Sequence, residues 1–592
     1  MRFLRRLIAL ALSFSLAAAL VPGSGLAATV VLVPFTTPSP ATMRSVTFSD
    51  ANHGWITGSY SSGGTEIGFI LATSDGGVSW KQIRTASGHT FNASVLTTPG
   101  VGIAASDYVN EVSRFGGTSW TTPAIDTSGA HVSEVGGLDF ANSQVGAVVG
   151  QATGLPLSDL PMKGQPAALY TTSDGGATWA KAWQGPPLPA AGDPPNDNPS
   201  GNAQLTAVDF AHETTNGWAI GYSDSDLTAL NTGITLRTTD GETWTPGDIS
   251  SFEGLSMRAT GIAARSDVEA WAIGASASYG AVAHTTNGGA TWSAETTLAA
   301  SSVKFKPMTD LDVSDSGVVI ASAGGSAPAI YRHDGTGWNQ VYSSASQLRA
   351  VTLVDGGPLG WAVGENGTVL KTTNAGATWQ PAPVYLAKTV TSATITTNAS
   401  TVNYGGSATL TVRLKNSDGV AVTGKSMKIY TSPGNGVWTY WKTVSVATGA
   451  TSFTVAPANK TYYRAIFLGD NDYVSATSVV APSVTPRVYL TTPTGPSYTY
   501  LGRTFTSVSY LKPKHATGTY PVKIMCYRYE AGKWVYRKYF MAKASNPTGS
   551  TTTKCSAAVK LPYRGKWRIR AYHVDAMHAA TYSGAVRTVI VK

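Results

Sequence analysis

The sequence is poor in the features that usually reveal a chemical function. Two cysteines and nine scattered histidines among 592 residues make no recognisable zinc signature, and no serine nucleophile elbow or phosphate-binding loop occurs. Helical periodicity is almost missing, and beyond the N-terminus no apolar run is long enough to cross a bilayer. We therefore expect an all-β protein with no cofactor, no metal centre and no transmembrane segment in the mature chain. Nothing points to an enzyme.

The N-terminus has the pattern of a secretion signal. Arg2, Arg5 and Arg6 precede an apolar stretch from Leu7 to Leu20, and the small residues around Ala27 offer a cleavage site. No cysteine follows the apolar stretch, which argues against a lipoprotein. We expect residues 1–27 to be a signal peptide, and the mature protein to be secreted or associated with the cell surface.

One short stretch recurs along the first two thirds of the chain. Its best copy, residues 73–80, reads T-S-D-G-G-V-S-W, and seven copies end at Trp80, Trp120, Trp179, Trp244, Trp292, Trp338 and Trp379. Six copies begin the turn with an acidic residue or asparagine: Asp75, Asp174, Asp240, Asn287, Asp334 and Asn374. Asp-Gly and Asn-Gly pairs between strand-like residues favour hairpins. We interpret these residues as turn formers rather than metal ligands or catalytic acids.

A second unit recurs upstream of these turns. Gly54-Trp55-Ile56-Thr57-Gly58 returns at residues 217–221, 270–274 and 360–364, each time about a dozen residues after another strand-like run. Each repeat therefore holds about four short strands, which is one propeller blade. We predict a seven-bladed β-propeller over residues 28–380, with blade two, around residues 91–120, the least well marked. Residues 29–33 are expected to close the ring by pairing with the last blade.

The combined pattern R-x-V-x-F, G-W-x-x-G and T-x-D-G-G-x-T-W, over residues 40–380, resembles the BNR/Asp-box β-propellers. It is most similar to the photosystem II stability/assembly-factor-like branch. The resemblance implies the fold, whereas members of such families include sialidases, xyloglucanases and sortilin-type receptors. The Arg-Ile-Pro stretch and arginine triad of sialidases are missing. A glycosidase needs two carboxylates about 5–10 Å apart, and acidic residues such as Asp139 and Asp209 lie in no motif.

Three arginines take the same place in the repeat alignment. Arg44, Arg258 and Arg349 occupy one register at the starts of blades one, five and seven, where the family resemblance implies partner binding. We expect them at one face of the ring, which would bind protein or glycan. The alternative is that each arginine bonds backbone carbonyls between blades. Four other blades carry Asn92, Gly136, Thr206 and Thr309 at this place.

Two further β-domains follow a Pro-rich linker. Residues 387–484, with the opening Y-G-x-S-x-T-L-T-V and the ending Y-Y-R-A-x-F-x-G-D-x-x-Y, resemble bacterial Ig-like repeats and predict a β-sandwich. Residues 485–592 predict a second Ig-like sandwich, with strands near 504–510, 521–529, 533–540, 554–561 and 566–573. Both cysteines, Cys526 and Cys555, lie in this last domain, and in an exported protein they predict a disulfide.

The charge is divided unevenly. Residues 485–592 hold 18 lysines and arginines against Glu530 and Asp575, a net charge of +16, whereas the rest of the mature chain carries −10. The predicted binding residues are the alternating cations of one strand, neighbouring cations and one interleaved tryptophan: Arg564, Lys566, Arg568, Arg570, Lys523, Arg528 and Trp567. A concentrated positive field attracts polyanions, so we expect an anionic cell-envelope polymer as partner and no nucleic acid. The alternative is a solvated surface that keeps the protein soluble.

These observations favour an exported, non-enzymatic surface or envelope protein with a propeller head and sandwich modules for spacing and attachment. The second hypothesis is a secreted glycan-active hydrolase with its site at the propeller axis. A paired-carboxylate cluster at the axial mouth would favour the hydrolase, and an aromatic or arginine-lined mouth without carboxylates would favour binding. A photosystem-type assembly factor is the third hypothesis, suggested by resemblance alone.

Overall fold

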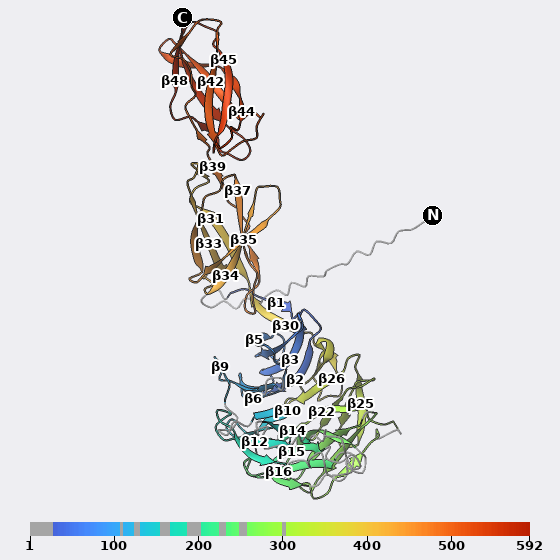
Figure 1. Ribbon diagram of the computed structural model, residues 1–592. Helices are drawn as coiled ribbons and strands as arrows, with labels where there is room; N and C mark the ends of the chain where they lie inside the picture. The colour runs from blue at the N-terminus through green and yellow to red at the C-terminus, as the bar shows by residue number, and fades with distance from the viewer. Residues whose placement is uncertain are drawn as a thin grey trace, which may run out of the picture. The chain divides into compact units, whose positions relative to one another are not determined.

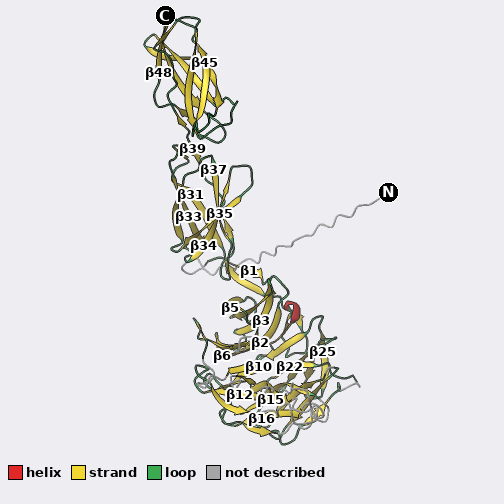
Figure 2. Cartoon of the chain, viewed as in Figure 1, coloured by secondary structure: helices red, strands yellow, loops and turns green. Residues whose placement is uncertain are grey.

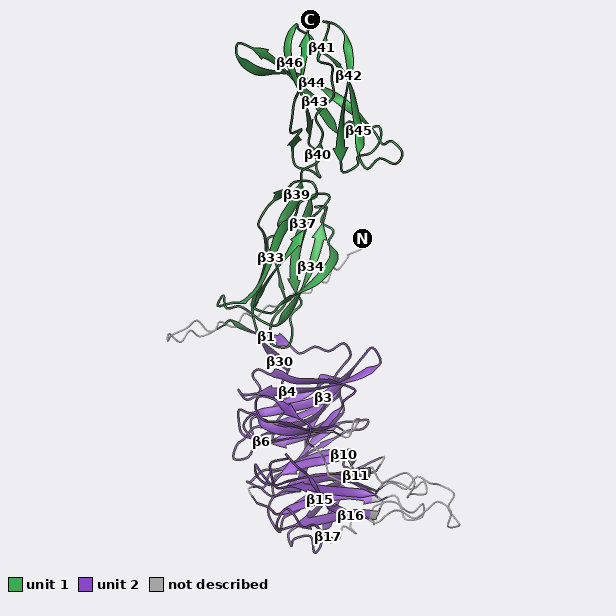
Figure 3. Ribbon diagram, turned by 60° about the vertical axis from the view of Figure 1, so that its left-hand side comes forward, with its two compact units in different colours: residues 1–30, 389–592 green, residues 31–388 purple. Residues whose placement is uncertain are grey.

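The computed structural model describes residues 28–592 except 107–110, 124–130, 154–165, 186–202, 213, 224–231, 248–256, 277 and 299–302. The predicted signal peptide lies outside the described residues. The chain divides into two compact units, residues 31–388 and residues 1–30 with 389–592 (Figure 3). Among the described residues the one helical element is a short 3₁₀ turn, η1 (Glu365–Gly367) (Figure 2). No described helix has the length and apolar character needed to cross a membrane.

Residues 31–388 form seven antiparallel sheets, each made of four consecutive strands (Figure 1). The strands are, sheet by sheet, β2 (Thr42–Phe48), β3 (Gly54–Ser62), β4 (Thr65–Thr73), β5 (Lys81–Ser87); β6 (Phe91–Thr98), β7 (Val101–Ser106), β8 (Glu111–Phe115), β9 (Trp120–Thr121); β10 (His131–Phe140), β11 (Gly146–Thr153), β12 (Ala167–Thr172), β13 (Ala180–Gln184); β14 (Ala203–Phe210), β15 (Gly217–Ser223), β16 (Thr232–Thr238), β17 (Thr245–Gly247); β18 (Arg258–Ala264), β19 (Ala270–Ala275), β20 (Gly280–Thr285), β21 (Ser293–Glu295); β22 (Met308–Val313), β23 (Val319–Ala323), β24 (Ala329–His333), β25 (Trp338–Ser343); β26 (Leu348–Leu353), β27 (Gly360–Gly364), β28 (Val369–Thr372), β29 (Gln380–Pro381).

The first strand of each sheet packs against the first strand of the next sheet, and β26 packs against β2, so the ring closes. The unit is therefore a seven-bladed β-propeller, which confirms the predicted fold. Blade two is a complete four-stranded sheet, although its sequence is the most divergent.

The N-terminal strand does not pair with the last blade, contrary to the prediction. β1 (Val30–Pro34) pairs with β30 (Tyr385–Thr389), which follows the last blade. The prediction that β1 pairs with the last blade is wrong because that blade already holds four strands of its own. The β30 segment in turn bonds the first blade, where the Trp80 amide donates to the Tyr385 carbonyl at 2.8 Å.

The turns between the third and fourth strands of blades one, three, four, five and seven share one hydrogen-bond pattern. In blade one, Thr73 Oγ1 accepts from the Gly77 amide at 2.9 Å, and the Asp75 carboxylate accepts from the Ser79 amide at 2.9 Å and the Ser79 hydroxyl at 2.6 Å. Asp174 repeats these bonds, whereas Asn287 and Asn374 donate their Nδ2 to the threonine hydroxyl instead. These side chains therefore fold the turns in which they lie.

Each such turn packs against the preceding blade. Gly77, at φ +78°, lies so close to Trp361 of blade seven that an added Cβ would come within 2.3 Å of its ring. Gly289 stands in the same relation to Trp218 of blade four. The tryptophans that end the turns are buried in five blades, and Trp120 and Trp292 are partly exposed. Glycine is needed here for both positive φ and close approach.

Residues 389–484 form a β-sandwich of two sheets. One sheet contains β31 (Thr391–Thr397), β33 (Ala408–Asn416) and β36 (Ala450–Val455). The other contains β32 (Thr401–Val402), β34 (Lys425–Ser432), β35 (Thr439–Val446), β37 (Thr461–Phe467), β38 (Ala476–Thr477) and β39 (Ser483–Pro486). Alternate residues of β33, such as Leu410, Val412 and Leu414, are buried between the sheets. This alternation is what the sequence pattern predicts for a sandwich.

The last domain is also a sandwich, and its strands are hydrogen-bonded to one another in one unbroken series. They are β40 (Tyr489–Leu490), β41 (Tyr498–Thr499), β42 (Thr504–Lys512), β43 (Val522–Glu530), β44 (Lys533–Ser545), β45 (Thr553–Lys560), β46 (Gly565–His573), β47 (Thr581–Tyr582) and β48 (Arg587–Val591). The long strand β44 pairs with β43 along its first part and with β45 near its end, so it passes from one layer to the other.

Candidate functional site

The predicted basic surface of the last domain lies on the outer face of β44, β43 and β46. Trp567, Ile569 and Ala571 of β46 are fully buried, so the residues that alternate with them point outward. Strand register then places tyrosines beside the cations: Tyr536, Tyr527 and Arg568 form one row, and Tyr539, Met525 and Arg570 form the next. We call the outward residues Lys523, Tyr527, Tyr536, Tyr539, Arg568 and Arg570 the tyrosine–arginine face.

The cations of this face lie against aromatic rings. The guanidinium of Arg568 is 4.2 Å from the Trp534 ring centroid, and that of Arg570 is 4.8 Å from Tyr582. The ammonium of Lys523 lies 4.8 Å from the Tyr539 ring. Such contacts hold the charged groups in place without neutralising them. Tyr536 and Tyr539 are each 45% exposed, so the face presents both apolar rings and positive charge to a ligand.

The two acidic side chains of residues 485–592 are engaged outside this face. Glu530 pairs with Arg528 at 3.3 Å and with Arg537, and Asp575 is surrounded by histidines. Arg528 also donates to the Arg564 carbonyl at 2.9 Å. Among the predicted binding residues, Arg528 is therefore committed to internal contacts. Arg564 and Lys566 are exposed at the start of β46.

Two sequence-based assignments in this domain are wrong. Trp567 is not part of a binding surface: it is a core residue whose Nε1 donates to the Tyr563 carbonyl at 2.9 Å. Cys526 and Cys555 are free, buried thiols and not a disulfide. They lie on strands of different layers, and Cys526 Sγ is directed 3.6 Å from the carbonyl of Ile524 on its own strand. Burial raises the pKa of both thiols to about 12, which keeps them protonated and unreactive.

The shared register predicted for three propeller arginines holds for only two. Arg44 and Arg349 each occupy the bulge in the first strand of their blade, opposite the Trp-containing strand. In blade five the bulge falls at Thr260, so Arg258 lies two residues earlier. In all three blades the bulge lies four residues before the end of the first strand, which places Thr260, and not Arg258, at the position of Arg44 and Arg349. The guanidinium of Arg258 lies 4.7 Å from the Tyr222 ring of blade four.

Other cations bond backbone carbonyls between blades. Arg114, Arg237 and Arg332, on third strands, donate to carbonyls in the turn of the next blade at 2.8, 3.2 and 2.9 Å. Lys371 does the same from blade seven to Gly76 of blade one, at 2.7 Å. Arg44 and Arg349 bond within their own blades, to Ser59 at 3.3 Å and Glu365 at 2.5 Å. The interblade role proposed for the blade-start arginines thus belongs to a different set of residues.

A group of carboxylates lies near the C-terminal ends of the first strands, at the other end from Arg44 and Arg349. Asp139, Asp209 and Asp312 are the penultimate residues of β10, β14 and β22, and all three are half-buried. Asp139 hydrogen-bonds Asp209, and the charge of Asp355, from the turn after β26, acts on both Asp139 and Asp312. At the same end of the ring, His212 Nδ1 lies 3.0 Å from Asp355 Oδ2. The axis therefore carries a carboxylate cluster, the feature that favours the hydrolase hypothesis, but Asp139 and Asp209 hydrogen-bond each other and so lie closer than the separation of about 5–10 Å of a glycosidase pair.

The same carboxylates also join neighbouring blades. Asp139 accepts from the Phe210 amide at 2.8 Å, Asp209 from the Ala264 amide at 2.7 Å and Asp312 from the Leu353 amide at 2.7 Å. Burial raises the pKa of Asp139 to about 6 and of Asp312 to about 7, against the opposing effect of these bonds. Burial and the adjacent Asp139 charge raise that of Asp209 as well. The Asp139–Asp209 pair therefore keeps a shared proton to higher pH than an isolated aspartate does.

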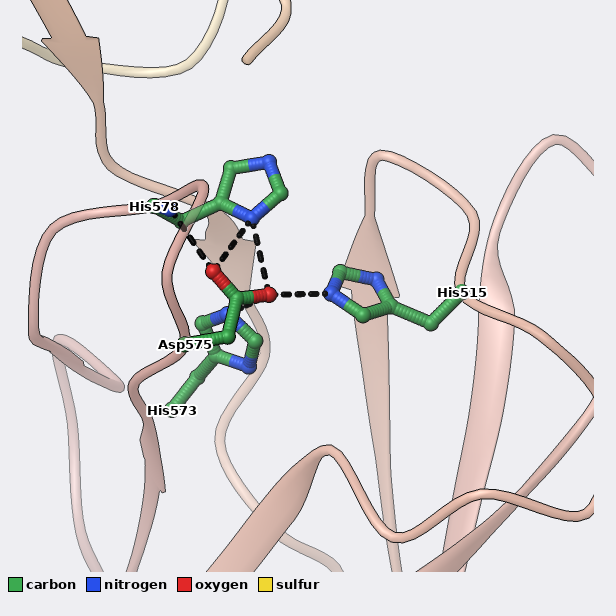
Figure 4. A group of neighbouring side chains, drawn as sticks. All are labelled: His515, His573, Asp575 and His578. Atoms are coloured by element: carbon green, nitrogen blue, oxygen red, sulfur yellow. Dashed lines mark hydrogen bonds and ion pairs between the residues drawn. The ribbon is translucent and has the colours of Figure 1, made fainter. Parts of the chain in front are cut away.

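The structure also brings together four residues that the sequence analysis did not single out. His515, His573, Asp575 and His578 converge in the last domain, with one ligand atom from each within 4.8 Å of all the others (Figure 4). His515 is 60 positions from Asp575, which is why the histidines look scattered in the sequence. The local spacing H-x-D-x-x-H over residues 573–578 is the one signal that could have drawn attention to them.

No protein-family model and no curated protein matches the chain. Among solved structures, it is similar to YCF48 bound to D1 peptide, at 16% identity over 58% of this chain and 94% of that chain, with a TM-score of 0.37. It is similar to the Yersinia pseudotuberculosis adhesin InvE at 14% identity, covering 34% of this chain and 58% of that one, with a TM-score of 0.19. The Escherichia coli adhesin FdeC is 12% identical, with 56% and 96% covered and a TM-score of 0.18. These likenesses concern fold alone.

Proposed function

We propose that this is an exported, non-enzymatic binding protein of the cell surface or envelope. Its tyrosine–arginine face binds an anionic cell-envelope polymer, and its propeller is a head that binds protein or glycan. The observation that carries the proposal is the alignment of exposed tyrosines with cations across three paired strands, in a domain of net charge +16. Guanidinium groups bind carboxylates and phosphates in a bidentate manner, and flat rings offer apolar contact to the polymer backbone.

Binding of the chain to poly(glycerol phosphate) and to polygalacturonate, with neutral dextran as the control polymer, tests this proposal. We expect affinity for both polyanions to fall as salt rises, because the attraction is electrostatic. The double variant Lys523→Gln, Arg568→Gln should weaken binding roughly tenfold, as expected for the loss of one or two charged hydrogen bonds.

The matched control is Arg413→Gln, Lys415→Gln, which removes two exposed cations from β33 of the middle domain. If both double variants weaken binding equally, the attraction depends on net charge and the proposed face is wrong. Binding to dextran as strong as binding to the polyanions would also contradict it.

A secreted glycan-active hydrolase is the second candidate, favoured by the Asp139–Asp209 pair. Two adjacent carboxyl groups that share one proton form an acid–base pair that can activate water. Incubation of the chain with polygalacturonate and with dextran, assayed for new reducing ends, tests this candidate. Release that is lost in Asp209→Asn would establish it, and no release from any polymer would leave the axial carboxylates as links between blades.

A further inference from the structure

Three histidines of the last domain point at one carboxylate. His573 ends β46, Asp575 and His578 lie in the following loop, and His515 comes from the loop after β42 (Figure 4). The distances from Asp575 Oδ2 are 3.1 Å to His515 Nε2, 3.3 Å to His573 Nε2 and 3.1 Å to His578 Nδ1. Asp575 Oδ1 accepts from the Met577 and His578 amides and also lies 3.1 Å from His578 Nδ1, so Oδ2 is the oxygen that lies near all three rings.

In each histidine ring, the outer nitrogen, which is the one that points away from Asp575, lies within hydrogen-bonding distance of a backbone carbonyl. His573 Nδ1 lies 2.8 Å from the Pro521 carbonyl, His515 Nδ1 3.0 Å from the Pro513 carbonyl, and His578 Nε2 3.2 Å from the Ala458 carbonyl. Because a carbonyl oxygen can only accept, each of these nitrogens must carry a proton. In a neutral imidazole the other nitrogen, which faces Asp575, then carries a lone pair and no proton. Three lone pairs and a carboxylate oxygen therefore face one another.

The innermost nitrogen gives independent support. The His573 side chain is fully buried, and its Nε2 has no hydrogen-bond partner in the part of the chain that the structure describes. Asp575 Oδ2 lies within ion-pair distance of it, but not in hydrogen-bonding geometry. Buried polar atoms are rarely left unsatisfied without a reason. A cation among the four groups would satisfy this nitrogen and remove the repulsion between the lone pairs and the carboxylate.

We propose that His515, His573, Asp575 and His578 form a metal site, and that Zn²⁺ is the ion it fits best. Three imidazoles and one carboxylate suit zinc, whereas calcium and magnesium require oxygen ligands. Zinc–ligand distances of about 2.0–2.1 Å place tetrahedral ligands about 3.3 Å apart, which matches the distances from Asp575 Oδ2. Backbone carbonyls on the outer nitrogens are the usual means of orienting metal-binding histidines.

The site has a structural role because all four zinc positions are occupied by side chains. It ties the loop after β42 to the loop after β46, which are far apart in the sequence. Metal binding to the folded chain would then stabilise the last domain by mass action. This inference is independent of the polymer-binding proposal.

Equilibrium dialysis of the full, tag-free chain against Zn²⁺, and against Co²⁺ with visible absorption as the readout, tests the site. We expect one zinc ion per chain and the intense visible bands of tetrahedral Co²⁺. His515→Ala and Asp575→Asn should each weaken zinc binding at least tenfold, as the loss of one ligand predicts. The side-chain amide oxygen in the Asp575→Asn variant would still accept from the Met577 and His578 amides, so this variant is the safer one for folding.

The matched control is His333→Ala, which removes a propeller histidine outside the cluster. Stoichiometric binding that is lost in both cluster variants and kept in the control supports the site. Absence of stoichiometric binding to the wild-type chain would overturn the proposal, as would binding that neither cluster variant weakens.

Discussion

The aspartates of the propeller occupy two regions with opposite electrostatics. At the turn, burial works against ionisation of Asp174, but hydrogen bonds from Thr178, Thr172 and Ala177 lower its pKa to about 2. At the axis, burial dominates and raises the pKa of Asp312 to about 7, although it also accepts backbone hydrogen bonds. The difference shows that hydrogen bonds decide the charge at an exposed corner, whereas desolvation and neighbouring carboxylates decide it at the centre.

The largest expected effect is at the axis. The folded-state pKa of Asp312 is raised above its usual value of about 3.9, so the native state binds more protons than the unfolded state between about pH 4 and 7. Its contribution to stability is present below pH 4 and is lost as pH rises to 7. Asp312→Asn keeps an oxygen for the Leu353 amide, and it should raise the unfolding free energy at pH 8 by up to about 4 kcal/mol. Denaturant unfolding followed by tryptophan fluorescence from pH 4 to 8 measures this gain.

The control for that experiment is Asp174→Asn, which neutralises a carboxylate of the other class and should give no gain at pH 8. If the two variants respond alike, the contrast between axis and turn is wrong.

The next effect is at the turn. Asp174→Ala removes acceptors for two backbone amides and the Thr178 hydroxyl, and we expect a loss of about 1–3 kcal/mol at pH 7. The folded pKa is lowered here, so the stabilisation is present above about pH 4 and is lost as pH falls toward 2. The cost of the substitution should therefore shrink in acid, as measured by the same unfolding experiment.

Asn287 and Asn374 fill this position in blades five and seven, so Asp174→Asn should retain most of the stability. A loss as large as that of the alanine variant would show that the charge, and not the hydrogen-bond pattern, holds the turn.

The smallest effect is expected in blade six. Asp334 is exposed and bonds to Thr336 and Arg332, without the preceding threonine that completes the turns of blades one, three, four, five and seven. Asp334→Ala should therefore lower the melting temperature by less than Asp174→Ala does. An equal decrease would mean that the turn of blade six, which lacks this threonine, contributes as much to stability as the turns that have it.

Much of the fold could be predicted because it depends on local chemistry. In five of the seven turns the glycine, threonine and aspartate or asparagine lie within eight residues of one another, and all seven turns end in tryptophan, so the propeller repeats are readable from the chain. The strands of the last domain are predictable for the same reason, since Trp567, Ile569 and Ala571 alternate with cations. The prediction of Trp567 as a binding residue fails on register alone, because one position decides whether a side chain lies in the core or on the face.

The chemistry of the candidate sites could not be predicted to the same extent. The axial carboxylates come from three different blades, and each lies at an ordinary strand end in the sequence. Whether Cys526 and Cys555 can bond depends on the distance and direction between their side chains on β43 and β45, and the offset of Arg258 follows from a bulge.

The sequence by itself determined the propeller repeats, the β-sandwich modules and the charge contrast, because repetition, alternation and composition are properties of the chain, whereas the structure showed that blade two is a complete blade. Only the tertiary structure decided which aspartates share a proton, which cations link blades and which histidines meet at Asp575. Those outcomes depend on distances between segments that the chain order does not contain.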